Sequence, residues 1–225
     1  MDLNEAFNTL KALANPENIK GMARYSINPR NALGVSIPNL RKLAKQAGKD
    51  HALALALWDS GIHEARILAG MVDDPRQVTS RQMDGWVKDF DSWDVCDQVC
   101  LNLFSKIPIA FDKAMEWSGR PEEFVKRAGF ALMACMAVGD KKAPDARFEI
   151  FMGAIERESG DERNYVKKAV NWALRQTGKR NIRLNRLAII AAERIRKQDS
   201  KSARWIASDA LRELTDEKIV SRLKS

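Results

Sequence analysis

Apolar residues recur every three or four positions through most of the chain, which is the spacing of α-helices that bury one face. The stretch from Asp161 to Arg180 is the clearest example, and its expected inward side consists of Val166, Val170, Ala173, Leu174 and Thr177. No useful run alternates apolar and polar residues as a strand would. The pattern predicts an all-α protein.

Capping and turn residues divide this pattern into roughly a dozen helices of about 10 to 17 residues. Polar N-caps are expected at Asp2, Ser36, Asp50, either Thr79 or Ser80, and Ser92. Prolines are expected to start three more helices, at Pro108, Pro121 and Pro144. The pair Asn15-Pro16 is expected to end the first helix at about Ala14, before a second short helix around Met22–Tyr25.

The helix pairs recur about every 35 to 45 residues, which is the period of HEAT-like solenoids. Short turns favour antiparallel neighbours, so we expect a curved superhelix of antiparallel helix pairs. A globular helical bundle is the alternative. No linker or low-complexity segment interrupts the chain, and residues 1–225 are therefore predicted to form a single domain.

The helix expected over Asp161–Arg180 has a second face that is cationic and aromatic. Lys168, Trp172, Arg175 and Lys179 follow one another at intervals of four, three and four residues, so they line up opposite the apolar side. A tryptophan among cations suits a flat, anionic partner better than a core. Core packing of Trp172 and a merely solvated basic face are the alternative interpretations.

Positive charge is concentrated in this part of the sequence. Between Asp161 and Lys197 there are eleven Lys and Arg residues and three Asp and Glu residues, and 11 − 3 = +8 equals the formal net charge of the whole chain. Local positive charge attracts polyanions and speeds their approach. The distribution favours a nucleic acid as the partner.

The three cysteines, Cys96, Cys100 and Cys135, form no disulfide-framework pattern and indicate reduced thiols in a cytosolic protein. Neither His51 nor His63 is near them in sequence, so we expect neither a metal site nor a cofactor. No stretch is long and apolar enough for a membrane span, and no signal peptide is evident. A cytoplasmic, nucleoid-associated monomer is the expectation.

Asp97 is the carboxylate that most needs an explanation. On the helix expected after Ser92, it falls with Trp93 at the margin of an apolar face, where it is partly removed from water. Asp94, in the first turn, is explained by the positive end of the helix dipole. A hydrogen bond from Asp97 to a neighbouring repeat is the alternative to a functional role.

Arg127 lies in a helix that is apolar almost all round, so its guanidinium needs an anionic partner. Asp97 and a phosphate from outside are both open as that partner. Glycine-rich phosphate loops, dinucleotide motifs and metalloprotease or serine-hydrolase motifs are missing. A carboxylate and aromatic faces suit a developing positive charge, such as the oxocarbenium-like transition state of N-glycosidic cleavage.

Five segments together carry a resemblance to a known family. These are MARYSINPRNALGVSIPNLRKLAK, HEARILAG, WVKDFDSWDVCDQVC, FVKRAGFALMA and YVKKAVNWALRQTGKRN. The chain resembles the AlkD-type DNA alkylation repair family from about Gly21 to Asn181. The resemblance implies a right-handed HEAT-like superhelix whose concave basic groove grips duplex DNA, and a monofunctional glycosylase that removes positively charged N3- and N7-alkylated purines without a metal.

The resemblance also implies roles for individual residues. Asp97 would be the catalytic carboxylate that stabilises the sugar cation, Trp93 and Trp172 the paired aromatics on the deoxyribose, and Arg127 the arginine of the intervening repeat. The candidate DNA contacts are Lys168, Arg175, Lys179, Arg180 and Tyr25. Some members carry a tryptophan where this chain has Ser92. A non-catalytic protein that binds damaged or branched DNA, and a protein-binding scaffold, are the alternatives.

Overall fold

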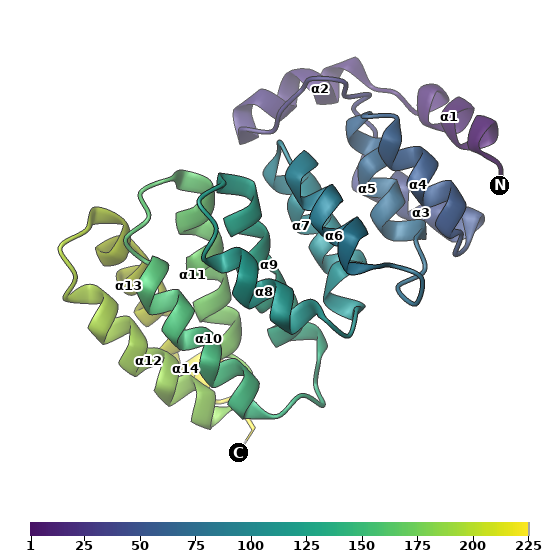
Figure 1. Cartoon of the computed structure of the whole chain (residues 1–225). Helices are drawn as coiled ribbons and strands as arrows, with labels where there is room; N and C mark the ends of the chain where they lie inside the picture. The colour runs from purple at the N-terminus through teal and green to yellow at the C-terminus, as the bar shows by residue number, and fades with distance from the viewer. Residues whose placement is uncertain (225) are drawn as a thin grey trace. The chain divides into compact units, whose positions relative to one another are not determined.

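The computed structural model describes residues 1–224, and within that range it contains helices and no strand (Figure 1). The all-α prediction is therefore confirmed. The chain divides into two compact units, one spanning Met1–Pro108 and the other starting at Ile109. This division rests on packing, and the single domain predicted from the sequence stays a prediction.

The first unit packs its helices around α5 (His63–Val72), which contacts α3, α4 and α7. Its remaining elements are α1 (Leu3–Ala12), α2 (Pro16–Met22), η1 (Ala23–Tyr25), α3 (Ile37–Ala47), α4 (His51–Asp59), α6 (Ser80–Trp86), η2 (Val87–Asp89), α7 (Trp93–Asn102) and η3 (Phe104–Lys106). Stacked Trp58 and Trp86, with ring centroids 4.0 Å apart, fill the space between α4 and α6.

The second unit consists of two layers of helices. One layer stacks α8 (Ala110–Ser118), α10 (Asp145–Glu158) and α12 (Ile182–Arg196), and the other stacks α9 (Glu123–Gly139), α11 (Asn164–Gly178) and α13 (Lys201–Leu214). The short helix α14 (Glu217–Val220) follows α13. Most of α9 is buried, as expected for a helix that is apolar almost all round.

A constant register links successive helix pairs of the second unit. Side chains bond across repeats at a separation of 38 residues, as in Arg127 to Tyr165, Asn171 to Asp209 and Ser200 to Glu162. In the first unit, Trp58 with Asp89 and His63 with Asp94 are each 31 residues apart. Repeated contacts at a fixed spacing are typical of solenoid repeats, and the 38-residue value lies inside the period predicted from the sequence.

The expected helix starts are largely confirmed. Asp2, Asp50 and Thr79 accept hydrogen bonds from backbone N–H groups in the first turn of their helices, while Ser36 and Ser92 hold the N-cap position without such a bond. The inward side predicted for α11 is fully buried. These features follow from local chemistry and apolar periodicity.

Three boundaries differ from the prediction. Asn15 does not only end a helix: its side chain caps α2, which starts at Pro16 and fills the space assigned to a turn. The reason is that proline, which opposes the continuation of a helix, also suits the first helical position, where its missing N–H is not needed. The helices expected from Pro108 and Pro121 each start two residues later, at Ala110 and Glu123, because Pro108 lies in a turn and Pro121 in a bend.

Candidate functional site

Trp93 and Asp97 lie one turn apart at the start of α7, and both are half-buried. The Trp93 indole Nε1 donates a hydrogen bond to the backbone carbonyl of Tyr25, 2.9 Å away. Cys96 and Cys100, on the inner side of the same helix, are fully buried. Asp97 therefore stands at the border between core and surface, as the sequence predicted.

A chain of hydrogen bonds braces this end of α7. The Ser92 hydroxyl donates to Asp94 Oδ1 at 2.6 Å, and Asp94 Oδ2 lies 2.8 Å from Nε2 of His63, which is 5% exposed. The Asn28 amide donates to Asp91 Oδ2 at 2.7 Å and ties the segment after η1 to the same place. The start of α7 is thus tied both to α5 and to the segment after η1.

The pair of His63 and Asp94 shifts the pKa of both groups. Burial lowers the pKa of His63, but the hydrogen bond and charge of Asp94, with Glu64 and Asp91, outweigh it and raise that pKa. Burial raises the pKa of Asp94, but the bonds from His63 and Ser92 lower it overall. The sequence predicted only an interaction of Asp94 with the helix dipole. Its bond to His63 could not be predicted in that way, because the two residues are 31 positions apart and meet only across a repeat.

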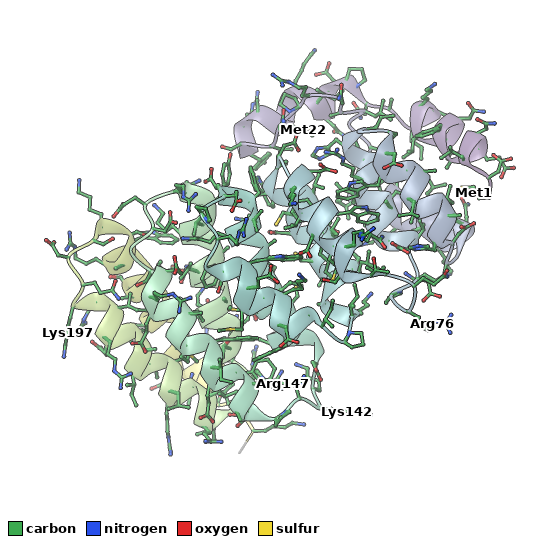
Figure 2. All side chains as sticks on the ribbon, in the orientation of Figure 1. Met1, Met22, Arg76, Lys142, Arg147 and Lys197 are labelled. Atoms are coloured by element: carbon green, nitrogen blue, oxygen red, sulfur yellow. The ribbon has the colours of Figure 1, made fainter. Side chains whose placement is uncertain are left out.

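Tyr25 supplies its carbonyl to Trp93 while its own ring stays 72% exposed. Beside it, a cavity of about 400 Å³ lies between the α2–η1 segment and α5. Met22, which Figure 2 labels on α2, lines this cavity together with His63 and Asp94. The exposed phenol ring is available for contact with a ligand.

The N-terminal half of α11 presents an open surface. Lys168 is exposed and forms no ion pair with any residue in the range 1–224. Trp172 is half-buried, and its indole makes no hydrogen bond or ring contact to the part of the chain that the structure describes. Both side chains are therefore accessible to solvent, and Trp172 lies outside the fully buried core.

The C-terminal half of α11 is occupied by carboxylates of α13. Arg175 Nη1 and Lys179 Nζ both donate to Glu213, and Arg175 Nε lies 3.6 Å from Asp209 Oδ2. Burial raises the pKa of Glu213, but Lys179 and Arg175 more than offset it and lower that pKa. Both cations were predicted to contact DNA, and their pairing with Glu213 could not be read from one helix because Glu213 lies 34 residues beyond Lys179 and 38 beyond Arg175.

Arg127 and Arg180 are held by backbone carbonyls. Arg127, 6% exposed, donates from Nη1 to the Tyr165 carbonyl at 2.7 Å. Arg180 donates to the carbonyl of Ala137 at 2.7 Å, at the C-terminal end of α9, and its guanidinium lies 3.7 Å from the centre of the Phe148 ring. Burial lowers the pKa of Arg180. Both arginines join neighbouring helices.

Much of the local charge excess is compensated by other helices. Arg183 pairs with Glu149 at 2.6 Å, and Arg194 pairs with Glu156 at 3.3 Å, so α10 supplies anions that the count over 161–197 left out. Lys197 follows the last residue of α12, and its side chain extends outward (Figure 2). The open positive surface is therefore smaller than the sequence count indicated.

Residues 1–224 contain neither a candidate metal-binding cluster nor a helix that could span a membrane. The described residues include no group of three or more His, Cys, Asp and Glu side chains that could hold a metal ion. All three cysteines are free and buried. In the same range, the helices are too short or too polar to cross a membrane.

The class of protein follows from the helix pairs and their repeat register, and the comparisons agree. A solved structure described as "a new family of proteins related to the HEAT-like repeat DNA glycosylases with affinity for branched DNA structures" matches with a TM-score of 0.78 at 19% identity, covering 95% of this chain and 96% of that one. This likeness confirms the HEAT-like fold. A designed armadillo repeat protein in complex with a (KR)4 peptide has a TM-score of only 0.40 at 15% identity, covering 79% and 92% of the two chains.

The family is shown by the sequence itself. The model of the family described as "DNA alkylation repair enzyme" matches residues 7–214. The chain belongs to the DNA alkylation repair enzyme family, and the resemblance found from its motifs is confirmed. No curated protein matches the chain.

Proposed function

We propose that this protein is a DNA glycosylase that releases cationic N3- and N7-alkylated purines from duplex DNA. The observation that carries the proposal is Asp97, a half-buried carboxylate one turn from Trp93 in a member of the alkylation repair family. A surface that only binds phosphates gains nothing from such a carboxylate, whereas a sugar cation is stabilised by it.

The chemistry needs little more than electrostatic stabilisation. An alkylated purine already carries a positive charge, so the C1′–N bond breaks with its electron pair leaving on the base, which departs neutral. The deoxyribose becomes an oxocarbenium-like cation, and water adds at C1′ and loses a proton. Asp97 opposes the positive charge and orients the water, while the face of Trp93 offers cation–π stabilisation.

The remaining candidates divide into contact and support roles. Lys168 and Trp172 contact the DNA backbone directly, Tyr25 adds an exposed ring, and Arg175 and Lys179 contribute once phosphates displace Glu213. Arg127 positions α11 through the Tyr165 carbonyl and is a positioning residue. Arg180, the fifth predicted DNA contact, we assign to support of α9. The enzyme acts as a monomer in the compartment that holds the DNA.

The test is incubation of the protein with duplex DNA that contains 7-methylguanine, followed by measurement of free base under single-turnover conditions. We expect release well above the spontaneous rate, and none from unmethylated duplex of the same sequence. Because the reaction needs no metal in this proposal, the rate should survive a chelator. Tight duplex binding with release at the spontaneous rate would reject the glycosylase function.

A second candidate is a non-catalytic protein that binds branched or damaged DNA. It is favoured by the described branched-DNA affinity of the structural relative and by Ser92, which stands where some alkylation repair enzymes have a tryptophan. This candidate predicts tighter binding to a four-way junction than to linear duplex, without base release. The same methylated substrate, compared with a junction in a binding titration, separates the two functions.

A further inference from the structure

A second tryptophan of the C-terminal unit is also placed outside its core. The buried side of α13 consists of small and aliphatic residues, all fully buried: Ala203, Ile206, Ala207, Ala210 and Leu214. Trp205 lies off that side and is 41% exposed. A large aromatic ring left in water forgoes the stabilisation of burial, so its position needs an explanation other than packing.

Cations surround the exposed indole. The Lys167 ammonium lies 5.2 Å from the centre of the Trp205 ring, within the range of a cation–π contact. Lys201, one turn before Trp205 on the same face of α13, is exposed and pairs with no carboxylate in residues 1–224. Lys168 follows Lys167 on α11 and is equally open.

The nearby carboxylates are already engaged. Glu162 accepts hydrogen bonds from the Ser200 hydroxyl and the Ser202 backbone N–H, at 2.8 and 3.1 Å, and so caps the start of α13. Asp199 pairs with Arg204 at 3.3 Å. Asp209 accepts from the Asn171 amide at 2.7 Å. The charge of Lys167 also acts on Glu162 and helps to lower the pKa of that carboxyl, after the hydrogen bonds from Ser202 and Ser200. Lys168 and Lys201 form no ion pair within residues 1–224, so their charge is open to an outside anion.

The register between α11 and α13 makes this surface continuous with the proposed DNA contacts. Lys167 and Trp205, like Asn171 and Asp209, are 38 residues apart, so Trp205 lies beside the N-terminal half of α11, which carries Lys168 and Trp172. An aromatic face flanked by lysines is the combination that binds single-stranded nucleic acid, because bases stack on the ring while cations hold the phosphates.

We propose that Trp205, Lys167 and Lys201 form a stacking platform for an unpaired nucleotide next to the duplex. A duplex interior hides the faces of its bases, so the platform recognises a single-stranded tail, flap or junction arm. The inference rests on the DNA binding proposed above and not on base excision. It names the structural class of DNA that this protein prefers.

The experiment compares three DNAs at equal ionic strength: a blunt duplex, the same duplex with a tail of about six thymidines, and the duplex with an equally long tail of abasic nucleotides. The parent should bind the thymidine-tailed duplex at least about fivefold more tightly than the blunt one, because stacking of each base on an aromatic ring is worth that much or more. The abasic tail, which has phosphates without bases, should recover little of that gain.

Trp205→Ala should remove most of the advantage of the thymidine tail, and Trp205→Phe should retain most of it because an aromatic face remains. Ile190→Ala is the matched control, since Ile190 is a comparably exposed apolar residue (47%) on α12. Circular dichroism of each variant verifies that it is folded.

Three results would overturn the platform. One is a parent that binds blunt and tailed duplexes alike, another is an equal loss of both affinities in Trp205→Ala, and the third is a Trp205→Ala variant that changes only self-association in sedimentation. Base release is measured on blunt methylated duplex, so a failure of the glycosylase function would appear there and leave this binding comparison readable.

Discussion

The start of α7 and the exposed face of α11 each carry a tryptophan that the sequence analysis singled out, and the two side chains are held very differently. Trp93 is fixed by a hydrogen bond to the Tyr25 carbonyl, next to the bonded chain of Ser92, Asp94 and His63. Trp172 has no such bond to residues 1–224, and its neighbour Lys168 is open to solvent.

The difference separates two tasks. A carboxylate that must oppose a short-lived charge needs a rigid position, because a small displacement costs much of its effect. A surface that follows a DNA backbone needs charge and adaptable side chains instead. We therefore expect substitutions at α7 to affect rate or stability, and substitutions at α11 to affect binding and its dependence on salt.

The largest effect is expected at Asp97. Asp97→Asn keeps the shape and removes the charge, so single-turnover release of 7-methylguanine at saturating enzyme should fall about a hundredfold, or about 3 kcal/mol. Duplex affinity should be unchanged or slightly improved. Asp59→Asn, which removes an exposed carboxylate from α4, is the matched control and should leave the rate as it is. Equal rates for Asp97→Asn and parent would make Asp97 a structural residue.

The second-largest effect is expected at the hydrogen-bonded pair of His63 and Asp94, which ties α5 to the start of α7. The folded-state pKa of His63 is raised, so its stabilising effect is complete below the unfolded value of about 6.5 and is lost as the pH rises through the folded value. The pKa of Asp94 is lowered, so its effect is present above about 3.9 and is lost on acidification through the folded value.

His63→Gln should therefore lower the free energy of unfolding by about 2 kcal/mol at pH 5.5, since it removes a buried hydrogen bond between charged groups. The loss should become smaller as the pH is raised to about 8.5, because the parent loses the contribution of protonated His63 as the pH passes its folded-state pKa. Urea unfolding of parent and variant at both pH values measures the difference. A loss that is the same at both would show that the charge of His63 does not contribute.

A smaller effect is expected at the C-terminal half of α11, where Arg175 and Lys179 pair with Glu213. Glu213→Gln removes the carboxylate that holds Arg175 and Lys179, so both cations become available to phosphates. Duplex affinity should rise several-fold at low salt, with a steeper salt dependence by about one to two units of slope. Glu217→Gln on α14 changes the net charge equally without touching these cations. If both variants improved binding alike, the gain would be a general charge effect.

The smallest effect compares two cations on the same helix. Lys168→Ala should reduce the slope of log affinity against log salt by about 0.9, the value for one lost phosphate contact. Arg175→Ala should reduce it less, because a phosphate must first displace Glu213 and Asp209 from Arg175. Binding titrations over a range of salt concentrations provide both slopes. A larger change for Arg175→Ala would mean that the ion pairs open freely.

The sequence by itself determined the helical class, the repeat spacing of the second unit and the family, whereas the 31-residue spacing of the first unit is shorter than the predicted 35 to 45 residues. Caps such as Asp2 and Asp50 act within one turn, and the buried side of α11 follows from a 3.6-residue period, so neighbours in sequence suffice to predict them. It also placed Asp97 correctly at the edge of an apolar face, because that position depends only on the periodicity of α7.

Only the tertiary structure decided which charged side chains are open. Glu213 neutralises Arg175 and Lys179, and Asp94 bonds to His63, from neighbouring repeats 31 to 38 residues away. A charge count over one helix leaves such partners out, since the register between helices is set by side-chain packing and not by local spacing. The exposure of Lys168 and the hydrogen bond from Trp93 to the Tyr25 carbonyl both depend on that packing.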